Sequence, residues 1–340
     1  MKHFITTQDW TLTELQALFD AAGKLKARPL QPRLQGRTIA LLFLNPSLRT
    51  RASFQIGAAQ LGATAVVLEP GNGVWGIEFD SGKVMDGDAE EHIVEVAEVL
   101  SRYCDLIAMR AFPGFKNWQY DRDDPMIKAL ARHAKVPVIN METIIHPCQE
   151  LALAMTLQEK LGELKGRKLC LTWTWHPQPL STAVANSVAM IATKFGMEVT
   201  LLCPNPDYVL DERFMKAALG NARESGGRLS LTHDIADGYR DADVVYANSW
   251  GALPYYGDPE KQWSQSRAFQ QFIVDDKKMS MTNNAIFSHS LPVRRNVEAT
   301  DAVMDGPHCA AIDEAGNRLH VQKALMLNLL GIGESDANGH

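Results

Sequence analysis

Residues 45–51 read Asn-Pro-Ser-Leu-Arg-Thr-Arg, and they decide how the first part of the chain folds. They follow the apolar run 38–44, which is typical of a parallel strand that is buried on both faces. After them, residues 51–61 place Phe54 and Ala58 on one face of a helix. The sequence therefore predicts a strand, a short polar turn and then a helix.

This turn is predicted to bind an anion, because the first N–H groups of a helix lack partners and the helix dipole is positive there. Ser47, Arg49, Thr50 and Arg51 would add donors at the same point. The stretch has neither the glycines and lysine of a P-loop nor a dinucleotide-binding G-x-G-x-x-G pattern. We expect a small phosphorylated ligand. In the alternative interpretation, Ser47 and Thr50 only cap the helix and both arginines are solvated.

The composition is that of an ordinary globular protein. The chain has 340 residues, 46% hydrophobic and 22% charged, and such a length predicts two domains of about 150 residues each. A net charge of −6 gives no reason to expect nucleic acid as a partner. We find no apolar run of membrane-spanning length and no signal-peptide core, and the five cysteines stand singly. The sequence thus predicts a cytoplasmic protein without a membrane partner or a metal site.

The order of elements predicts an α/β protein with two doubly wound parallel-sheet domains, residues 1–150 and 151–317. The first domain is expected to have strands at 38–44, 65–68, 105–109 and 136–141, and helices at 11–27, 51–61, 90–103, 126–133 and 147–160. The second is expected to have strands at 168–173, 199–203, 229–232, 244–247 and 285–288, and helices at 182–195, 211–223 and 264–272. A last helix at 318–330 precedes a tail, after Gly331, that we expect to be disordered.

Residues 146–149, His-Pro-Cys-Gln, follow the fourth predicted strand. His146 and Gln149 are three residues apart, which is close enough on a first helical turn to converge on one ligand. Neutral His and Gln can hydrogen-bond a carbonyl oxygen or an amide while Arg49 and Arg110 hold a phosphate. A single histidine in such a place is more often structural, and that alternative stays open here.

Four stretches resemble motifs of the aspartate and ornithine carbamoyltransferases, and the likeness extends to near residue 325. Residues 47–51 resemble the Ser-x-Arg-Thr-Arg motif for carbamoyl phosphate, and 146–149 resemble His-Pro-x-Gln. Residues 249–251 (Ser-Trp-Gly) are similar to the ornithine-binding Ser-Met-Gly, and 289–292 (His-Ser-Leu-Pro) to His-Cys-Leu-Pro. The resemblance implies the carbamoyltransferase fold, in which the last two stretches face the anion site across a cleft. Ordinary loops are the alternative for these two.

Other features resemble the N-acyl-ornithine branch of this family: Trp250 in place of methionine, an expanded loop at 70–88, and the stretch 173–177. That branch uses N-acetyl- or N-succinyl-ornithine on a route to arginine and contains a trefoil knot, which we place at 175–185. Glu90 matches the acetyl branch, and its carboxylate would repel a succinyl group. We therefore expect N-acetyl-L-ornithine as substrate and N-acetyl-L-citrulline as product. Succinylornithine, plain ornithine, and a Glu90 that is only a solvated charge in a first helical turn are the alternatives.

The resemblance implies a reaction without a cofactor or a metal, and it implies the site residues. Catalysis is assigned to Arg49, Thr50, Arg110, His146 and Gln149. Carbamoyl phosphate is expected to contact Ser47, Leu48, Arg49, Thr50, Trp75, Arg110, His146, Pro147, Cys148, Gln149, Ser290, Leu291 and Arg318, with Trp75 coming from a neighbouring subunit of a homotrimer. N-acylornithine is expected to contact Glu90, Glu142, Asn248, Ser249, Trp250, Leu291 and Arg294.

Two residues depart from the family pattern. The acyl-ornithine branch usually has lysine where this chain has Asn248, and losing that charge partner for a substrate carboxylate would cost roughly 2–3 kcal/mol. Ser290 replaces cysteine, which is a mild change if the position acts through its backbone. A non-catalytic binder of acylated amino acids is therefore an alternative, although the retained phosphate-binding residues argue against it. A nucleotide-dependent oxidoreductase is disfavoured, because residues 45–48 hold no glycine fingerprint.

Overall fold

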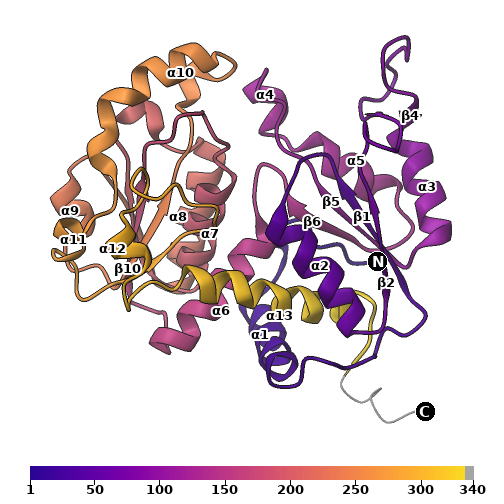
Figure 1. Ribbon diagram of the computed structural model, residues 1–340, viewed down its shortest axis with the longest axis horizontal. Coiled ribbons are helices and arrows are strands. Elements are labelled where there is room, and N and C mark those ends of the chain that lie inside the picture. The colour runs from indigo at the N-terminus through magenta and orange to yellow at the C-terminus, as the bar shows by residue number, and fades with distance from the viewer. Residues whose placement is uncertain (334–340) are drawn as a thin grey trace. The chain divides into compact units, whose positions relative to one another are not determined.

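The computed structural model describes residues 1–333 as two compact α/β units, each with a parallel sheet (Figure 1). Unit 1 contains Met1–Pro113, Gln119–Cys148 and the chain from Asn317 onward. Unit 2 contains Gly114–Trp118 and Gln149–Gly316. The predicted fold class, with two units of parallel sheet, is confirmed. The tail for which the sequence predicts disorder lies, from residue 334 on, outside the described residues.

Unit 1 is built on a four-stranded sheet in the order β2-β1-β5-β6. Its strands are β1 (Thr38–Phe43), β2 (Thr64–Leu68), β5 (Leu106–Arg110) and β6 (Val138–Glu142). All neighbouring strands pair in parallel, so that β1, β5 and β6 end at the same edge. All four strands match predicted ones. The edge at which parallel strands end is where such sheets bind ligands.

Helices pack on this sheet and on one another. The helices of unit 1 are α1 (Leu12–Ala27), α2 (Leu48–Gln60), α3 (Ile93–Tyr103) and α5 (Pro125–His133), with a short 3₁₀ helix η1 (Thr7–Asp9) and the later part of α13 (Ala311–Leu329). Residues of α3 and α5 form an apolar cluster with Ala40, Leu42 and Met109 of the sheet. Gly57 of α2 lies against α13, where an added Cβ would come within 3.2 Å of Lys323 Cγ.

The start of α3 differs from the prediction of a helix from residue 90. Glu91–His92 forms a short strand, β4, which pairs in parallel with β3 (Ile77–Glu78). The His92 side chain caps α3 by accepting a hydrogen bond from Val94 N at 3.3 Å. Glu90 therefore precedes both β4 and the helix, and the alternative that it is a first-turn helix charge is wrong.

The segment Gly114–Trp118 belongs to unit 2, although it lies within residues 1–150. Its aromatic rings explain this, because Phe115 and Trp118 lie 5.8 and 5.1 Å from the ring of Tyr256. The indole N–H of Trp118 also donates to Asp211 at 2.7 Å. The short helix α4 (Trp118–Asp121) begins at the end of this segment and was not predicted.

Unit 2 has a five-stranded sheet in the order β11-β10-β7-β8-β9. Its strands are β7 (Lys168–Trp173), β8 (Glu198–Leu202), β9 (Arg228–Thr232), β10 (Val244–Asn248) and β11 (Ile286–Ser288). All of them pair in parallel, and each matches a predicted strand. β10 and β11 therefore carry the residues that follow them, 249–251 and 289–292, to the same edge of this sheet.

The helices that belong to unit 2 in whole or in part are α6 (Pro147–Leu161), α7 (Ala183–Lys194), α8 (Glu212–Ser225), α9 (Ile235–Tyr239), α10 (Pro259–Ser266), α11 (Asp276–Met279), α12 (Asp301–Met304) and the first residues of α13, with 3₁₀ helices η2 (Pro206–Tyr208), η3 (Leu253–Tyr255) and η4 (Arg267–Phe272). The helix predicted at 264–272 is wrong as one element. It divides into α10 and η4, because Asp258 caps a helix that already begins at Pro259. Within residues 1–333, none of the helices combines the length and apolarity that a bilayer span requires.

Candidate active site

Ser47 caps α2, as its place after β1 predicts. Its backbone is extended and its hydroxyl accepts a hydrogen bond from Thr50 N at 3.1 Å. The hydroxyl of Thr50 is not part of this cap, since it accepts a hydrogen bond from Arg318 Nη2 at 2.8 Å. The side chain of Leu48 is exposed. The cap of the alternative interpretation is therefore present for Ser47, while Thr50 faces an arginine.

Three arginines of unit 1 gather around one carboxylate. Arg110 donates to Glu142 in an ion pair, and His146 Nε2 lies 3.1 Å from the same carboxylate oxygen. The charges of Arg49 and Arg318 also act on Glu142. The Nε atoms of Arg49, Arg110 and Arg318 are buried and have no hydrogen-bond partner among residues 1–333. Three guanidinium groups share one carboxylate, so this cluster has an excess of positive charge and of unused donors.

Burial controls the protonation of this cluster. It raises the pKa of the Glu142 carboxyl, while the charges of Arg110, Arg318 and Arg49 act in the opposite direction. Burial and the same three arginines hold the pKa of His146 well below its ordinary value, so the imidazole is neutral near pH 7. Burial also lowers the pKa of Arg318 to about 10, which still leaves it charged. The result is a fixed cationic site with a neutral histidine at its edge.

Arg51, the last residue of the predicted anion turn, has other partners. It forms an ion pair with Glu69 and its guanidinium carbon lies 5.1 Å from the centre of the Phe43 ring. Trp75 and Glu90 are exposed, and neither side chain forms a hydrogen bond or an ion pair with a described residue. The structure thus brings Ser47, Arg49, Thr50, Arg110, Glu142, His146 and Arg318 together, and it leaves Arg51, Trp75 and Glu90 outside this cluster.

Gln149, the third residue of α6, belongs to unit 2 and is almost fully buried. Its Nε2 donates to the carboxylate of Glu314, which also accepts from Tyr246 OH at 3.0 Å and from the hydroxyl of Ser288. The other amide atom of Gln149, Oε1, is buried without a hydrogen-bond partner among the described residues. Glu314 was missed in the sequence, where its only signal is its place four residues before Arg318 in the last helix.

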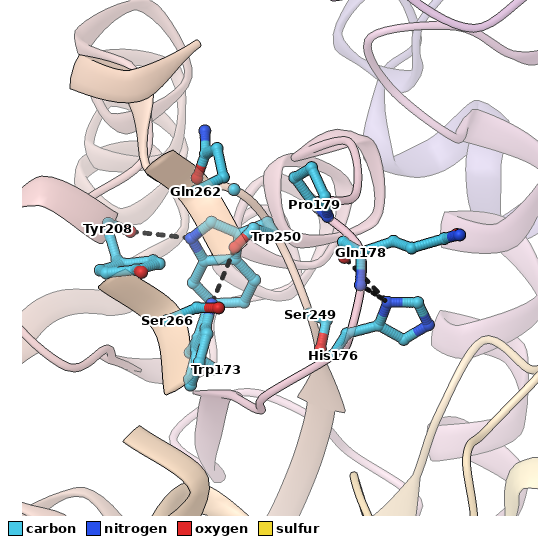
Figure 2. Close-up of a pocket in the computed structure, with 10 residues that line it drawn as sticks. Trp173, His176, Gln178, Pro179, Tyr208, Ser249, Trp250, Gln262 and Ser266 are labelled. Carbon is cyan, nitrogen blue, oxygen red and sulfur yellow. Dashed lines mark hydrogen bonds between the residues drawn. The ribbon is translucent and has the colours of Figure 1, made fainter. Parts of the chain in front are cut away.

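The end of β10 places Asn248, Ser249 and Trp250 in different surroundings. Asn248 and Ser249 are buried, and the Ser249 hydroxyl donates to the carbonyl of Thr174. The indole N–H of Trp250 donates to Tyr208 O at 2.8 Å, so its polar atom is already satisfied inside unit 2. Figure 2 shows Trp250 beside Tyr208 in the wall of a small pocket. The cavity volume of this pocket is only about 10 Å³, and Ser249 also lines it.

The loop after β11 is held by two histidines. His289 Nδ1 accepts from Leu291 N at 2.9 Å, and its Nε2 lies 3.5 Å from Glu298. Arg294 donates through Nε to His176 Nε2 at 2.8 Å and through its backbone N to Glu298 at 2.7 Å. These contacts fix the backbone on both sides of Ser290 and Leu291. Sequence reasoning missed both the His176–Arg294 contact and the buried Glu298.

Within residues 1–333, His, Cys, Asp and Glu form no group of three or more that could hold a metal ion. All five cysteines are free thiols. The clustered polar groups described above are donors to anions and amides, which is chemistry of hydrogen bonding and charge.

Two family models match this chain. Residues 2–159 match the carbamoyl-phosphate binding domain of aspartate/ornithine carbamoyltransferases. Residues 167–329 match the aspartate/ornithine binding domain of the same enzymes.

Similar proteins agree with these matches. The N-acetylornithine carbamoyltransferase of Xanthomonas campestris pv. campestris is 60% identical over 97% of this chain and 98% of its own length. A crystal structure of acetylornithine transcarbamylase complexed with acetylcitrulline covers 97% of this chain and 99% of its own, with a TM-score of 0.96 and 60% identity. A glutamate-to-proline variant of N-acetyl-L-ornithine transcarbamylase, complexed with carbamyl phosphate and N-succinyl-L-norvaline, has the same TM-score and identity and covers 97% of this chain and 100% of its own. The chain therefore belongs to the aspartate/ornithine carbamoyltransferase family.

Proposed function

We propose that this protein transfers the carbamoyl group of carbamoyl phosphate to the side-chain amine of N-acetyl-L-ornithine, in arginine biosynthesis. The products are N-acetyl-L-citrulline and phosphate. Relatives at 60% identity carry the name of this enzyme, and their solved structures hold acetylcitrulline or carbamyl phosphate. Within this chain, the observation that carries the proposal is the set of three guanidinium groups around the Glu142 carboxylate, whose Nε atoms are buried without a partner among the described residues.

We assign carbamoyl phosphate to residues 1–150 with the helix at 318–330, and N-acylornithine to residues 151–317. Arg49 and Arg110 are assigned to bind the phosphate oxygens, since a guanidinium can present two parallel N–H donors to them. The N–H groups at the start of α2 add further donors. Thr50 N already donates to Ser47, so the N–H groups before it are the ones that face the phosphate.

The carbamoyl group needs donors for its oxygen and an acceptor for its NH₂. The Thr50 hydroxyl accepts from Arg318, so its own proton is available to the carbamoyl oxygen. The neutral imidazole of His146 is the second donor once Glu142 has turned to the substrate. Gln149 Oε1 is a buried acceptor without a partner among the described residues, and it suits the NH₂ together with the backbone carbonyls of Ser290 and Leu291.

In the reaction, the side-chain nitrogen of acetylornithine forms a bond to the carbamoyl carbon. Negative charge then builds on the carbamoyl oxygen, where fixed donors stabilise the tetrahedral intermediate most strongly. The bond from that carbon to the phosphate oxygen breaks, and phosphate leaves with the proton of the amine. Arg49 and Arg110 hold the departing charge in a buried site, where ionic hydrogen bonds are strong. The chemistry requires no cofactor.

N-acylornithine is assigned to Glu90, Glu142, Asn248, Ser249, Trp250, Leu291 and Arg294. Glu90 is exposed and lies outside any helix, so its carboxylate is free to line an acyl site and to reject a succinyl group. We infer that Glu90 occupies the position of the glutamate whose proline variant was solved with N-succinyl-L-norvaline.

We further propose a cytoplasmic homotrimer in which Trp75 of each subunit closes the site of a neighbour. Trp75 supports this because 67% of its surface is exposed, which is unusual for so large an apolar side chain. The free cysteines suit a reducing compartment. We also place a trefoil knot at 175–185, supported by the contacts of this stretch with Gly251 N at Leu180 O (2.9 Å) and with Arg294 at His176 (2.8 Å).

A citrulline-forming assay tests this function. Purified protein is given carbamoyl phosphate with ornithine, N-acetylornithine, N-succinylornithine or putrescine. We expect acetylornithine to have the highest kcat/KM, and the release of one phosphate for each citrulline group formed. If another amine gave a higher kcat/KM, that amine would be identified as the substrate in place of acetylornithine. No product with any of the four would favour the non-catalytic binder, which calorimetry with acetylornithine alone would then detect.

A further inference from the structure

Glu314 is a fully buried carboxylate that the proposed reaction does not use. It lies near the start of α13 and accepts hydrogen bonds from the amide of Gln149, from Tyr246 OH at 3.0 Å and from the hydroxyl of Ser288. These donors come from α6, β10 and β11. Burial raises the pKa of Glu314 and the three donors act to lower it.

The contacts of Glu314 join stretches that carry proposed substrate residues. Tyr246 stands two residues before Asn248, and Ser288 stands two residues before Ser290. Gln149 is itself assigned to the carbamoyl group. One carboxylate therefore holds three stretches that are far apart in the sequence, all of them within unit 2.

The chemistry of a carboxylate determines how the amide of Gln149 is turned. Glu314 accepts hydrogen bonds from all three neighbours, so its carboxylate holds Nε2 of Gln149 toward it and leaves Oε1 facing away. Oε1 is buried and has no hydrogen-bond partner among residues 1–333. Because an unpaired buried acceptor is unfavourable, this side of Gln149 is prepared for a ligand that donates a hydrogen bond.

We propose that Glu314 is a positioning residue that turns Gln149 Oε1 toward the carbamoyl NH₂ and thereby selects carbamoyl phosphate over acetyl phosphate. This inference rests on the proposed function, in which Gln149 contacts that NH₂. Acetyl phosphate has a methyl group in place of NH₂ and cannot donate a hydrogen bond to Oε1. If the amide of Gln149 were reversed, its own NH₂ would meet the NH₂ of the substrate and the preference would disappear.

The test compares the affinities of the wild type and Glu314→Gln for carbamoyl phosphate and acetyl phosphate by calorimetry. An amide at position 314 can either donate or accept, so the amide of Gln149 is no longer held in one orientation. We expect the affinity for carbamoyl phosphate to fall about tenfold or more, while that for acetyl phosphate changes less than about twofold. The control is Ser288→Ala, which removes one donor to Glu314 and leaves the Gln149 contact, so the ratio of the two affinities stays as in the wild type.

A purely structural Glu314 would lower Tm in the Glu314→Gln variant without changing the ratio of the affinities, and that result overturns the inference. If Glu314→Gln does not fold, the same comparison is made with Glu314→Asp, whose shorter side chain withdraws the carboxylate from Gln149. An unchanged ratio of the two affinities in Glu314→Asp also overturns the inference. A wild type that binds neither phosphate overturns the proposed function, and this inference with it. A wild type that binds both equally well overturns this inference alone.

Discussion

Arg49 and Arg51 stand two residues apart in the same motif, but they have different surroundings. Arg51 forms an ion pair with Glu69 and lies over the ring of Phe43. Arg49 Nε is buried without a hydrogen-bond partner in the described part of the chain. Burial, with the charge of Arg110, lowers the pKa of Arg49, so this guanidinium gains when an anion arrives. The sequence pattern alone gives no means to separate the two arginines.

This difference predicts opposite outcomes for two matched substitutions. Arg49→Ala should abolish turnover and carbamoyl phosphate binding and leave the fold intact, because a donor to the phosphate is lost. Arg51→Ala should change binding only a few-fold, since its partner is Glu69. Calorimetry with carbamoyl phosphate and circular dichroism on both variants check this. If Arg49→Ala bound carbamoyl phosphate within a few-fold of wild type, the anion site would be wrongly placed.

Glu90 distinguishes the two acylated substrates. If its carboxylate lines the acyl site, Glu90→Ala or Glu90→Pro should lower kcat/KM for acetylornithine and raise it for succinylornithine. Removing one like-charge repulsion in a partly desolvated site is worth on the order of 1–3 kcal/mol, which is a shift of about ten- to a hundredfold in the ratio. The matched control is Glu91→Ala, because Glu91 is the adjacent carboxylate. A ratio that stays constant in both variants would remove Glu90 from the acyl site.

The strands of the four-stranded and five-stranded sheets could be predicted from the sequence, whereas the short pair β3 and β4 and several helix ends could not. Buried parallel strands appear as continuous apolar runs, and β1 and β7 are of this kind. Helix ends depend on single capping side chains, such as His92 for α3 and Asp258 for α10. Hydrophobic periodicity does not report such caps, because a capping residue lies outside the apolar face.

The residues of the candidate site also fall into those that could be predicted from the sequence and those that could not. Residues that follow strands, such as Arg49 and His146, could be predicted because parallel strands end at one edge of a sheet. Glu314 could not, since a glutamate in a helix is usually solvated and only the fold shows that it is buried. The satisfied indole of Trp250 and the His176–Arg294 contact also depend on tertiary structure.

The contact between α2 and α13 allows a test at the level of helix packing. A Cβ at Gly57 would meet Lys323 at 3.2 Å and the side chains of Leu319 and Met326 at 3.5 Å. Gly57→Leu should therefore displace α13, move Arg318 away from Thr50 and weaken carbamoyl phosphate binding about tenfold or more.

Gly23→Leu is the control for this helix test. Gly23 lies within α1 and has open space around it, so a larger side chain fits there and replaces a poor helix former. Its Tm should rise or stay constant, and its affinity for carbamoyl phosphate should equal that of the wild type. Equal affinity of Gly57→Leu and wild type would mean that Arg318 does not depend on this packing.

The proposed trimer makes a prediction for the assembled molecule. Trp75→Ala and Arg49→Ala should each be inactive alone, for lack of the neighbour's tryptophan or of the phosphate donor. When the two variants are mixed and reassembled one to one, about a quarter of the sites should combine a native Arg49 with a native Trp75. Activity that returns on mixing, measured by citrulline formation, supports shared sites. Sites contained in one subunit would stay inactive in every mixture.

Unit 1 takes residues from both sides of unit 2 in the sequence, and this order matters when genes of the family recombine. A single crossover between Gln149 and Gly316 joins Thr50 and Gly57 from one parent to Arg318 from the other. Such a hybrid is expected to bind carbamoyl phosphate only if both parents have the same contacts between α13 and the residues Thr50 and Gly57. Two crossovers, one on each side of Gln149–Gly316, exchange that stretch but leave Gly114–Trp118 with the other parent, so the hybrid must also keep contacts such as the one from Trp118 to Asp211. Recombination can therefore transfer Asn248, Ser249, Trp250, Leu291 and Arg294 together, while Glu90 and Glu142 stay with the arginines of the phosphate site.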